Sequence, residues 1–192
     1  MKTLLFAFLL LLISCSAKNS KMQANEQCYK NMITDSITEG FDRNENSTSV
    51  FLNLDFSGDV KVFDKMNRVI KVVKNDIENE NYVMFELLQK NDSMFYVIAY
   101  WSLDNEMITK GWIYKNNHLG IYSATYNSDF ILYEKPYNLK SVIVTDEYNS
   151  RIYEVIDFDG RWLKIRTEIK NKIYSGWIPP EMQCSNVYST CN

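Results

Sequence analysis

The chain lacks several features that mark whole classes of protein. It has a single histidine, His118, and no cluster of basic residues. Beyond its first fifteen residues it has no apolar run long enough to span a bilayer as a helix. No segment after residue 50 shows a helical period of adequate length. The missing basic cluster argues against nucleic acid and anionic lipid headgroups as ligands, because proteins bind both mainly through lysine and arginine.

The chain has too few histidine and cysteine side chains in suitable positions to favour a metal site or a hydrolase site. One distant histidine with Cys184 and Cys191 does not provide the four convergent ligands of a zinc site. His118 lies in the polar stretch NNHLG without a nucleophile motif beside it, so we expect it to be solvated. A hydrolase could use only Cys28 with His118, and Cys28 lies in polar, tether-like sequence. We therefore expect no enzyme activity, no metal and no cofactor.

The N-terminus is typical of an exported lipoprotein. Lys2 precedes an apolar run from Leu4 to Ile13, which is the layout of a signal peptide. The stretch Leu-Ile-Ser-Cys that ends at Cys15 resembles a bacterial lipobox. This resemblance implies that residues 1–14 are removed and that Cys15 is lipidated, with enough acyl chains for stable anchoring. We expect a lipid-anchored protein of the bacterial cell envelope, facing the periplasm because the residues after Cys15 carry no acidic run, with surface exposure left open.

The mature chain divides into a polar tether and a β-rich remainder. Removal of Lys2 leaves 20 basic and 24 acidic side chains, a net charge near −4. Residues 15–49 are rich in Asn, Ser, Lys and Glu and indicate a tether. Within them, the residues from Met32 to Phe41 fit a short helix or a first strand equally well. From Val50 on, short runs of Val, Ile, Tyr, Phe and Trp are broken by Asn, Asp and Gly, which predicts an all-β domain.

An internal repeat runs through the β-rich part. Four pairs of similar segments occur in the same order, with separations of about 65 to 70 residues. The pairs are VFDK 62–65 with LYEK 132–135, FELL 85–88 with YEVI 153–156, NDSMFYVI 91–98 with FDGRWLKI 158–165, and KGWI 110–113 with SGWI 175–178. The sequence therefore predicts two copies of one unit, over residues 50–126 and 127–192.

Each copy is small for an independent core, so we expect the two copies to pack against each other. Asp92-Ser93 and Asp159-Gly160 stand between strand-like runs and predict two equivalent hairpin turns.

The repeat resembles the bacterial SH3-like domain, a small β-barrel of cell-envelope proteins. The second copy carries this resemblance from Phe130 to Pro179, through Trp162, Ile165 and the triplet Gly176, Trp177 and Ile178. The first copy departs from the family pattern, with Phe95 at the position of the first tryptophan and Met66 at that of Pro136. The closing WIPPEMQCSNVYSTC is similar to the tails of SH3-like lipoproteins of the Bacteroidetes type. The resemblance implies two tandem SH3-like barrels packed together.

The cysteines of the tail are expected to form a disulfide. Export places the mature chain in an oxidising compartment, where Cys184 and Cys191 lie within reach of each other. Such a bond would hold down a tail that otherwise frays. Cys28 is then the odd cysteine: it is buried and reduced, pairs with a partner protein, or competes for Cys184 or Cys191.

The candidate ligand-binding residues are aromatic. The SH3-like resemblance implies an aromatic-lined groove, and the second copy and its tail contain Tyr133, Tyr137, Trp162, Trp177 and Tyr188. The two tryptophans occupy strand positions that favour the core, whereas Tyr133 and Tyr137 are expected to show a ring face to solvent. We expect non-catalytic binding of a peptidoglycan stem peptide or an envelope protein. The alternative is an inhibitor or immunity lipoprotein that neutralises a secreted toxin or lytic enzyme by stoichiometric binding.

Overall fold

The computed structural model describes residues 47–115, 118–124, 129–147, 151–189 and 191, all within the compact unit Phe41–Asn192. The expected signal peptide, the lipidation site Cys15, the odd cysteine Cys28 and the undecided segment from Met32 to Phe41 lie outside these residues. None of the described residues belongs to a helix long and apolar enough to cross a membrane.

The described residues confirm the prediction of an all-β domain. They form thirteen strands and one short 3-10 helix, and the strands hold most of the β-branched and aromatic side chains, which suit a pleated, half-buried surface. The strands are β1 (Thr48–Leu52), β2 (Val60–Phe63), β3 (Val69–Val73), β4 (Val83–Lys90), β5 (Met94–Trp101), β6 (Met107–Tyr114), β7 (Leu119–Ser123), β8 (Phe130–Tyr133), β9 (Val142–Asp146), β10 (Tyr153–Asp159), β11 (Trp162–Ile169), β12 (Lys172–Ile178) and β13 (Gln183–Cys184), and the helix is Pro180–Met182.

The strands of the described chain pair into one antiparallel sheet with two open ends. Its order is β3-β2-β6-β5-β4-β1-β7-β10-β11-β12-β8-β9, and β13 pairs separately with β7. At the ends, β3 pairs only with β2 and β9 only with β8 among the described residues. Because this pairing does not close on itself, the two SH3-like barrels stay a prediction.

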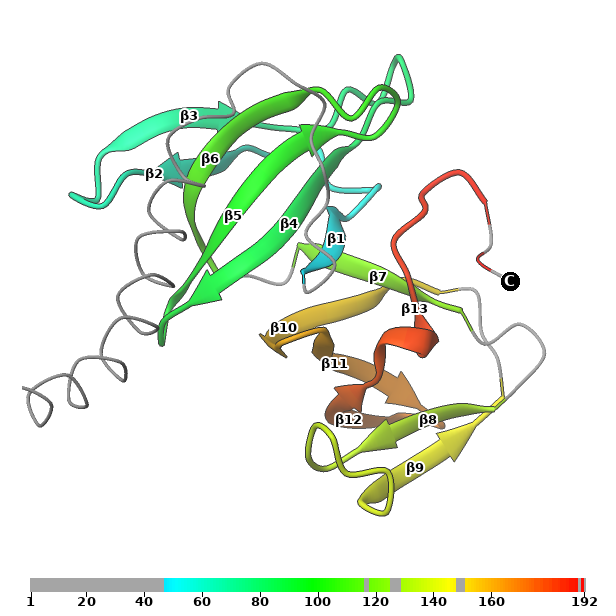
Figure 1. The fold of residues 1–192 in the computed structure, drawn as a ribbon. Helices are drawn as coiled ribbons and strands as arrows, with labels where there is room; N and C mark the ends of the chain where they lie inside the picture. Colours follow the sequence, from blue (N-terminus) through cyan, green and yellow to red (C-terminus); the bar gives the residue numbers. More distant parts are fainter. Residues whose placement is uncertain (1–46, 116–117, 125–128, 148–150, 190, 192) are drawn as a thin grey trace, which may run out of the picture. The chain divides into compact units, whose positions relative to one another are not determined.

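The strand order contains the internal repeat. From the middle of the sheet outward, the first set of strands runs β1-β4-β5-β6-β2-β3 and the second runs β7-β10-β11-β12-β8-β9, so each strand has a counterpart six strands later. The two sets meet where β1 pairs with β7, with Phe51 opposite Gly120 and Leu52 opposite Leu119 (Figure 1). We call these sets the first and second repeats.

The second repeat begins earlier than the expected boundary at residue 127. That boundary falls between β7 and β8, whereas the strand order repeats from Leu119. The sequence of β7, LGIYS, is short and follows the polar stretch Asn116 to His118, so its local pattern looks like part of a connection. Its pairing with β1 and β10 makes it a strand.

Strand register also corrects the sequence alignment by one residue. Val97 of β5 lies opposite Gly111, and Ile165 of β11 lies opposite Gly176, so these two residues are equivalent. Met94, and not Phe95, therefore matches Trp162. The second hairpin turn is Gly160-Arg161, since Asp159 pairs with Trp162. Gly160 has φ +53°, a backbone conformation that glycine adopts without strain.

The two Gly-Trp pairs are explained by a close approach between strands. A Cβ on Gly111 would lie 2.6 Å from the carbonyl oxygen of Phe63, and one on Gly176 would lie 3.0 Å from that of Tyr133. The tryptophans that follow, Trp112 and Trp177, pair with the same two residues. In both repeats the glycine thus gives a strand room to cross its neighbour.

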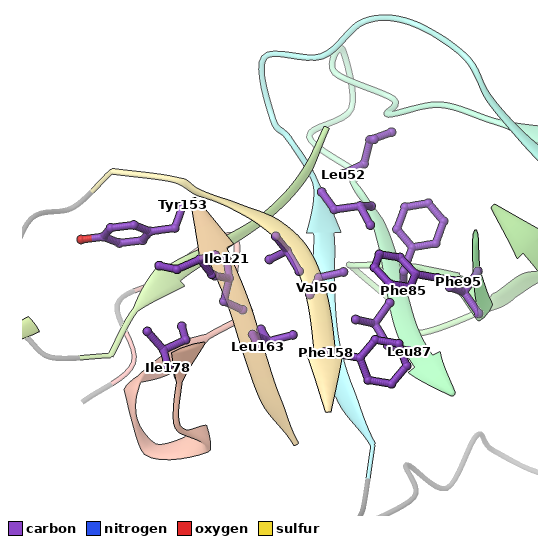
Figure 2. Packing of buried hydrophobic residues seen from close by; sticks show 14 of the residues in the cluster. Val50, Leu52, Phe85, Leu87, Phe95, Ile121, Tyr153, Phe158, Leu163 and Ile178 are labelled. Atoms are coloured by element: carbon purple, nitrogen blue, oxygen red, sulfur yellow. The ribbon is translucent and has the colours of Figure 1, made fainter. Parts of the chain in front are cut away.

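One hydrophobic core joins the two repeats. Its buried members come from both repeats, including Val50, Phe85 and Phe95 of the first and Tyr153, Phe158 and Leu163 of the second (Figure 2). The rings of Phe95 and Phe158 lie 5.4 Å apart across the junction. The predicted packing of the copies against each other is therefore present within the described residues.

Candidate functional site

Two of the candidate tyrosines, Tyr133 and Tyr137, pack on Trp162. The ring of Tyr133 meets the ring of Trp162 edge-on at 5.8 Å between centroids, and the ring of Tyr137 lies 5.5 Å away. Tyr133 and Trp162 are buried, whereas Tyr137 is 63% exposed. The expectation that Tyr133 shows a ring face to solvent is wrong, because its strand, β8, pairs with β12 and places the residue against the core.

The Tyr137 side chain is hydrogen-bonded to the hairpin turn between β10 and β11. Its hydroxyl donates a hydrogen bond of 2.7 Å to the carbonyl of Asp159. A Cβ on Gly160 would lie only 2.3 Å from that hydroxyl oxygen, so the glycine makes space for it. The exposed ring of Tyr137 remains accessible, but its polar group already serves the fold.

Trp177 lies under lysines at the junction of the repeats. It is buried, and the Nζ atoms of Lys90 and Lys164 each lie 5.9 Å from its ring centroid. Lys90 extends from the first repeat and pairs with Asp157 of the second at 3.0 Å, while Lys115 pairs with the same carboxylate at 3.4 Å. Lys90, over Trp177 and paired with Asp157, and Lys115, paired with Asp157, therefore connect the two repeats.

The contacts with Lys90 and Lys115 change the pKa of the Asp157 carboxyl. Burial raises its pKa, but hydrogen bonds from the Lys90 ammonium and the Phe158 N–H, with the charges of Lys90 and Lys115, outweigh burial. The pKa of Asp157 is therefore below its ordinary value. The ionised form stabilises the contact between the repeats.

The predicted Cys184–Cys191 disulfide is present and closes the tail into a loop. Within that loop, the Tyr188 hydroxyl donates to the carbonyl of Glu80 at 2.8 Å and contacts the Ser102 hydroxyl. Between this loop, the strands β4 and β5 and the connection from β5 to β6 lies a cavity of about 400 Å³. Tyr188 therefore ties the tail of the second repeat to the first repeat.

A larger cavity, which we call the β3 pocket, lies in the first repeat and was not predicted from the sequence. Its volume is about 670 Å³. Its apolar wall includes Val72 and Val73 of β3, Trp101 at the end of β5 and Ile108 near the start of β6, and its polar lining includes Ser57, Lys71, Lys74, Asn75, Asp76 and Glu78. Trp101 and Ile108 are partly buried and pack on the core, so this wall is supported from behind.

Two lysines of the β3 pocket, Lys71 and Lys74, take part in none of the ion pairs that the described side chains form. The Asp76 carboxylate accepts a hydrogen bond of 2.8 Å from the side-chain amide of Asn79 and a second one from the Asn79 backbone N–H. The pocket thus combines an indole and aliphatic wall with two ammonium groups, Lys71 and Lys74, and two carboxylates, Asp76 and Glu78. The ammonium groups lie within or next to β3 and the carboxylates lie beyond its end, so the part of the pocket beside β3 suits a ligand that carries carboxylates next to an apolar group.

His118 differs from its expected solvated state. Its ring stacks on that of Phe56 with centroids 3.7 Å apart, and its carbonyl accepts a hydrogen bond from the Asn53 N–H. Within the described part of the chain, no three His, Cys, Asp or Glu side chains come together as metal ligands do.

Comparisons with known proteins leave the family open. No family model matches the chain, and no curated protein is similar to it. Among solved structures, NlpC2 from Trichomonas vaginalis is 15% identical, with 73% of this chain and 49% of that chain covered and a TM-score of 0.29. NlpC1 from the same organism is 14% identical, with 77% and 48% covered and a TM-score of 0.29. The chain spans about half the length of these structures, and TM-scores of this size carry no argument about fold or function.

Proposed function

We propose that this protein is a non-catalytic lipoprotein of the bacterial cell envelope, anchored through Cys15, whose two repeats are SH3-like units. Its role is to bind a carboxylate-bearing peptide, either a stem peptide of peptidoglycan or a segment of an envelope protein. The binding site is the β3 pocket of the first repeat. The alternative role, inhibition of a toxin or lytic enzyme, would use the same kind of contact with a folded partner.

The single observation that supports this proposal is the composition of the β3 pocket. Its volume, about 670 Å³, is in the range of small-molecule and peptide sites. Trp101 and Ile108 offer an apolar surface, and Lys71 and Lys74 offer positive charge at β3, while Asp76 and Glu78 carry negative charge beyond the end of that strand. A peptide with apolar and acidic side chains can satisfy both features at once.

The aromatic cluster of the second repeat supports binding less well. Tyr133 and Trp162 are buried, and the Tyr137 hydroxyl is bonded to Asp159. Trp177 is buried beneath Lys90 and Lys164. Of the five candidate rings, only those of Tyr137 and Tyr188 are exposed, and the hydroxyl of each donates a hydrogen bond to a backbone carbonyl.

Charge reversal in the β3 pocket tests the proposal. The test variant of the full-length protein is Lys71→Glu with Lys74→Glu. The matched control is Lys135→Glu with Lys140→Glu, two exposed lysines of the second repeat that make the same change in net charge. Circular dichroism first establishes that both variants are folded.

Two arms then separate the sources of the peptide. The first measures co-sedimentation with purified peptidoglycan, and the second measures retention of detergent-extracted envelope proteins on the immobilised protein. We expect saturable binding in one arm, weakened about tenfold by the test variant and unchanged by the control. If neither arm depends on Lys71 and Lys74, the β3 pocket is not the binding site and the proposal fails.

A further inference from the structure

β3 is exposed in a way that is unusual for a strand within a folded domain. Val69, Ile70 and Val72 are 49%, 48% and 44% exposed. The pairing of β3 with β2 shifts register at Ile70, between Val69 and Lys71, and on both sides of this shift β3 shows apolar groups to solvent. Its outer edge has no strand partner among the described residues. Such an edge presents free backbone N–H and C=O groups to another chain.

The β3 pocket lies along this same strand. Lys71, Val72 and Val73 of β3 line the cavity, and Lys74 directly follows the strand. A segment that pairs with the edge would therefore lay alternate side chains beside Trp101 and Ile108. The neighbouring lysines would meet any carboxylate on that segment at short range.

We propose that β3 is a docking edge for an extended acidic segment of another envelope protein, which adds to the sheet as a further strand. This inference rests on the proposed binding function and selects a protein as the source of the peptide. Backbone hydrogen bonds to β3 supply affinity, and the β3 pocket selects alternating apolar and acidic side chains.

Charge favours this occupant over a second copy of the chain. Lys71 lies in the middle of β3, so two β3 edges that paired with each other would bring like charges together. The equivalent edge in the second repeat, β9, has no lysine within it and ends in Asp146, which pairs with Arg151 at 3.6 Å. An acidic segment therefore prefers β3 to β9.

The edge also favours protein over peptidoglycan. Pairing along a strand requires a regular pleated backbone with side chains alternating between faces. Stem peptides of peptidoglycan mix D- and L-residues, which interrupts that alternation, whereas a protein segment keeps it.

Synthetic octapeptides test the inference on the purified full-length protein. The probe alternates valine and glutamate. The first comparison peptide alternates valine and lysine, and the second is the valine-glutamate peptide with every second backbone nitrogen methylated. Methylation keeps the side chains and charge but removes donors that strand pairing needs. Calorimetric titration should show the acidic peptide binding about tenfold more tightly than either comparison peptide.

Protein variants and hydrogen exchange locate the binding. Lys71→Glu with Lys74→Glu should reverse the preference, so that the lysine peptide binds more tightly, and Lys135→Glu with Lys140→Glu should leave it unchanged. Amide exchange of residues 69–73 should slow when the acidic peptide is bound, because the edge amides gain partners.

Three outcomes would overturn the inference. If the methylated peptide binds as tightly as its parent, the contact is electrostatic and no strand is added. If no peptide binds while pelleting with peptidoglycan still depends on Lys71 and Lys74, strand addition is wrong and the proposed function stands. If replacing these lysines changes neither peptide binding nor either arm of the earlier assay, both strand addition at β3 and the proposed binding function are wrong.

Discussion

Single residues show where the two repeats have diverged. Glu154 of β10 is bonded to Arg166 of β11 at 3.1 Å, whereas its equivalent Glu86 lies opposite Ile98. Glu86 is 1% exposed, and no described residue gives its Oε2 atom a hydrogen bond. The first repeat thus carries a buried carboxylate without the arginine that its counterpart has.

Replacement of this carboxylate should stabilise the protein. We expect Glu86→Met, which keeps the length of the side chain, to raise the free energy of unfolding by about 1–3 kcal/mol, because it removes a buried carboxylate whose Oε2 atom has no hydrogen bond from a described residue. The control Glu154→Met breaks an ion pair with a half-exposed arginine and should lower that free energy by less than about 1 kcal/mol. Urea unfolding measures both. A loss of stability in Glu86→Met would mean that the carboxylate has a favourable partner.

Asp157 should make stability depend on pH in the acid range. Its pKa in the folded protein is lowered, so its ionised form stabilises the fold above the ordinary carboxyl pKa, and this contribution is lost as pH falls through the lower folded value. We expect the melting temperature to fall below about pH 4 more steeply in the wild type than in Asp157→Asn. Parallel profiles for the two proteins would exclude Asp157 as a source of the dependence.

At the scale of elements, the Gly-Trp strands of the two repeats differ in how much room their glycines have. A Cβ added to Gly111 would lie 2.6 Å from the Phe63 carbonyl oxygen and 2.7 Å from a methyl group of Val62, whereas one added to Gly176 would have its nearest contacts at 3.0 Å. We expect Gly111→Ala to destabilise the protein by about 1–3 kcal/mol and Gly176→Ala by less. Thermal unfolding of the two variants gives the comparison, and equal effects would contradict the difference in packing.

The strands also show which features of the fold can be predicted from sequence patterns. Alternating apolar residues and the echoed Gly-Trp pairs predicted strands, repeat and packed copies, because these features are local or recur in the chain. The pattern missed β7, whose five residues become a strand only by pairing with β1 and β10. It placed Tyr133 at the surface, since burial of that residue depends on β12 from the far end of the repeat. The β3 pocket is lined by residues that lie far apart in the sequence, namely Ser57, residues 71–78, Trp101 and Ile108. No local sequence pattern can predict that these residues come together.

The whole described unit should unfold as one. Pairing of β1 with β7, the shared core and the contacts of Asp157 with two lysines connect the repeats, and the tail returns through β13 and Tyr188. We therefore expect a single thermal transition, with coincident curves from far-ultraviolet circular dichroism and tryptophan fluorescence. Two separated transitions would show that the repeats fold independently.

The central claim, that the edge of β3 is the binding surface in the cell, can be tested directly by photo-crosslinking in intact cells. Val69 on β3 and Val142 on β9 occupy equivalent positions and are 49% and 51% exposed, so a photoreactive residue at either site samples its surroundings equally well. We predict a discrete crosslinked product with an envelope protein from position 69, lost when Lys71→Glu and Lys74→Glu are added, and none from position 142. Equal products from both positions, or a product only from position 142, would contradict the account.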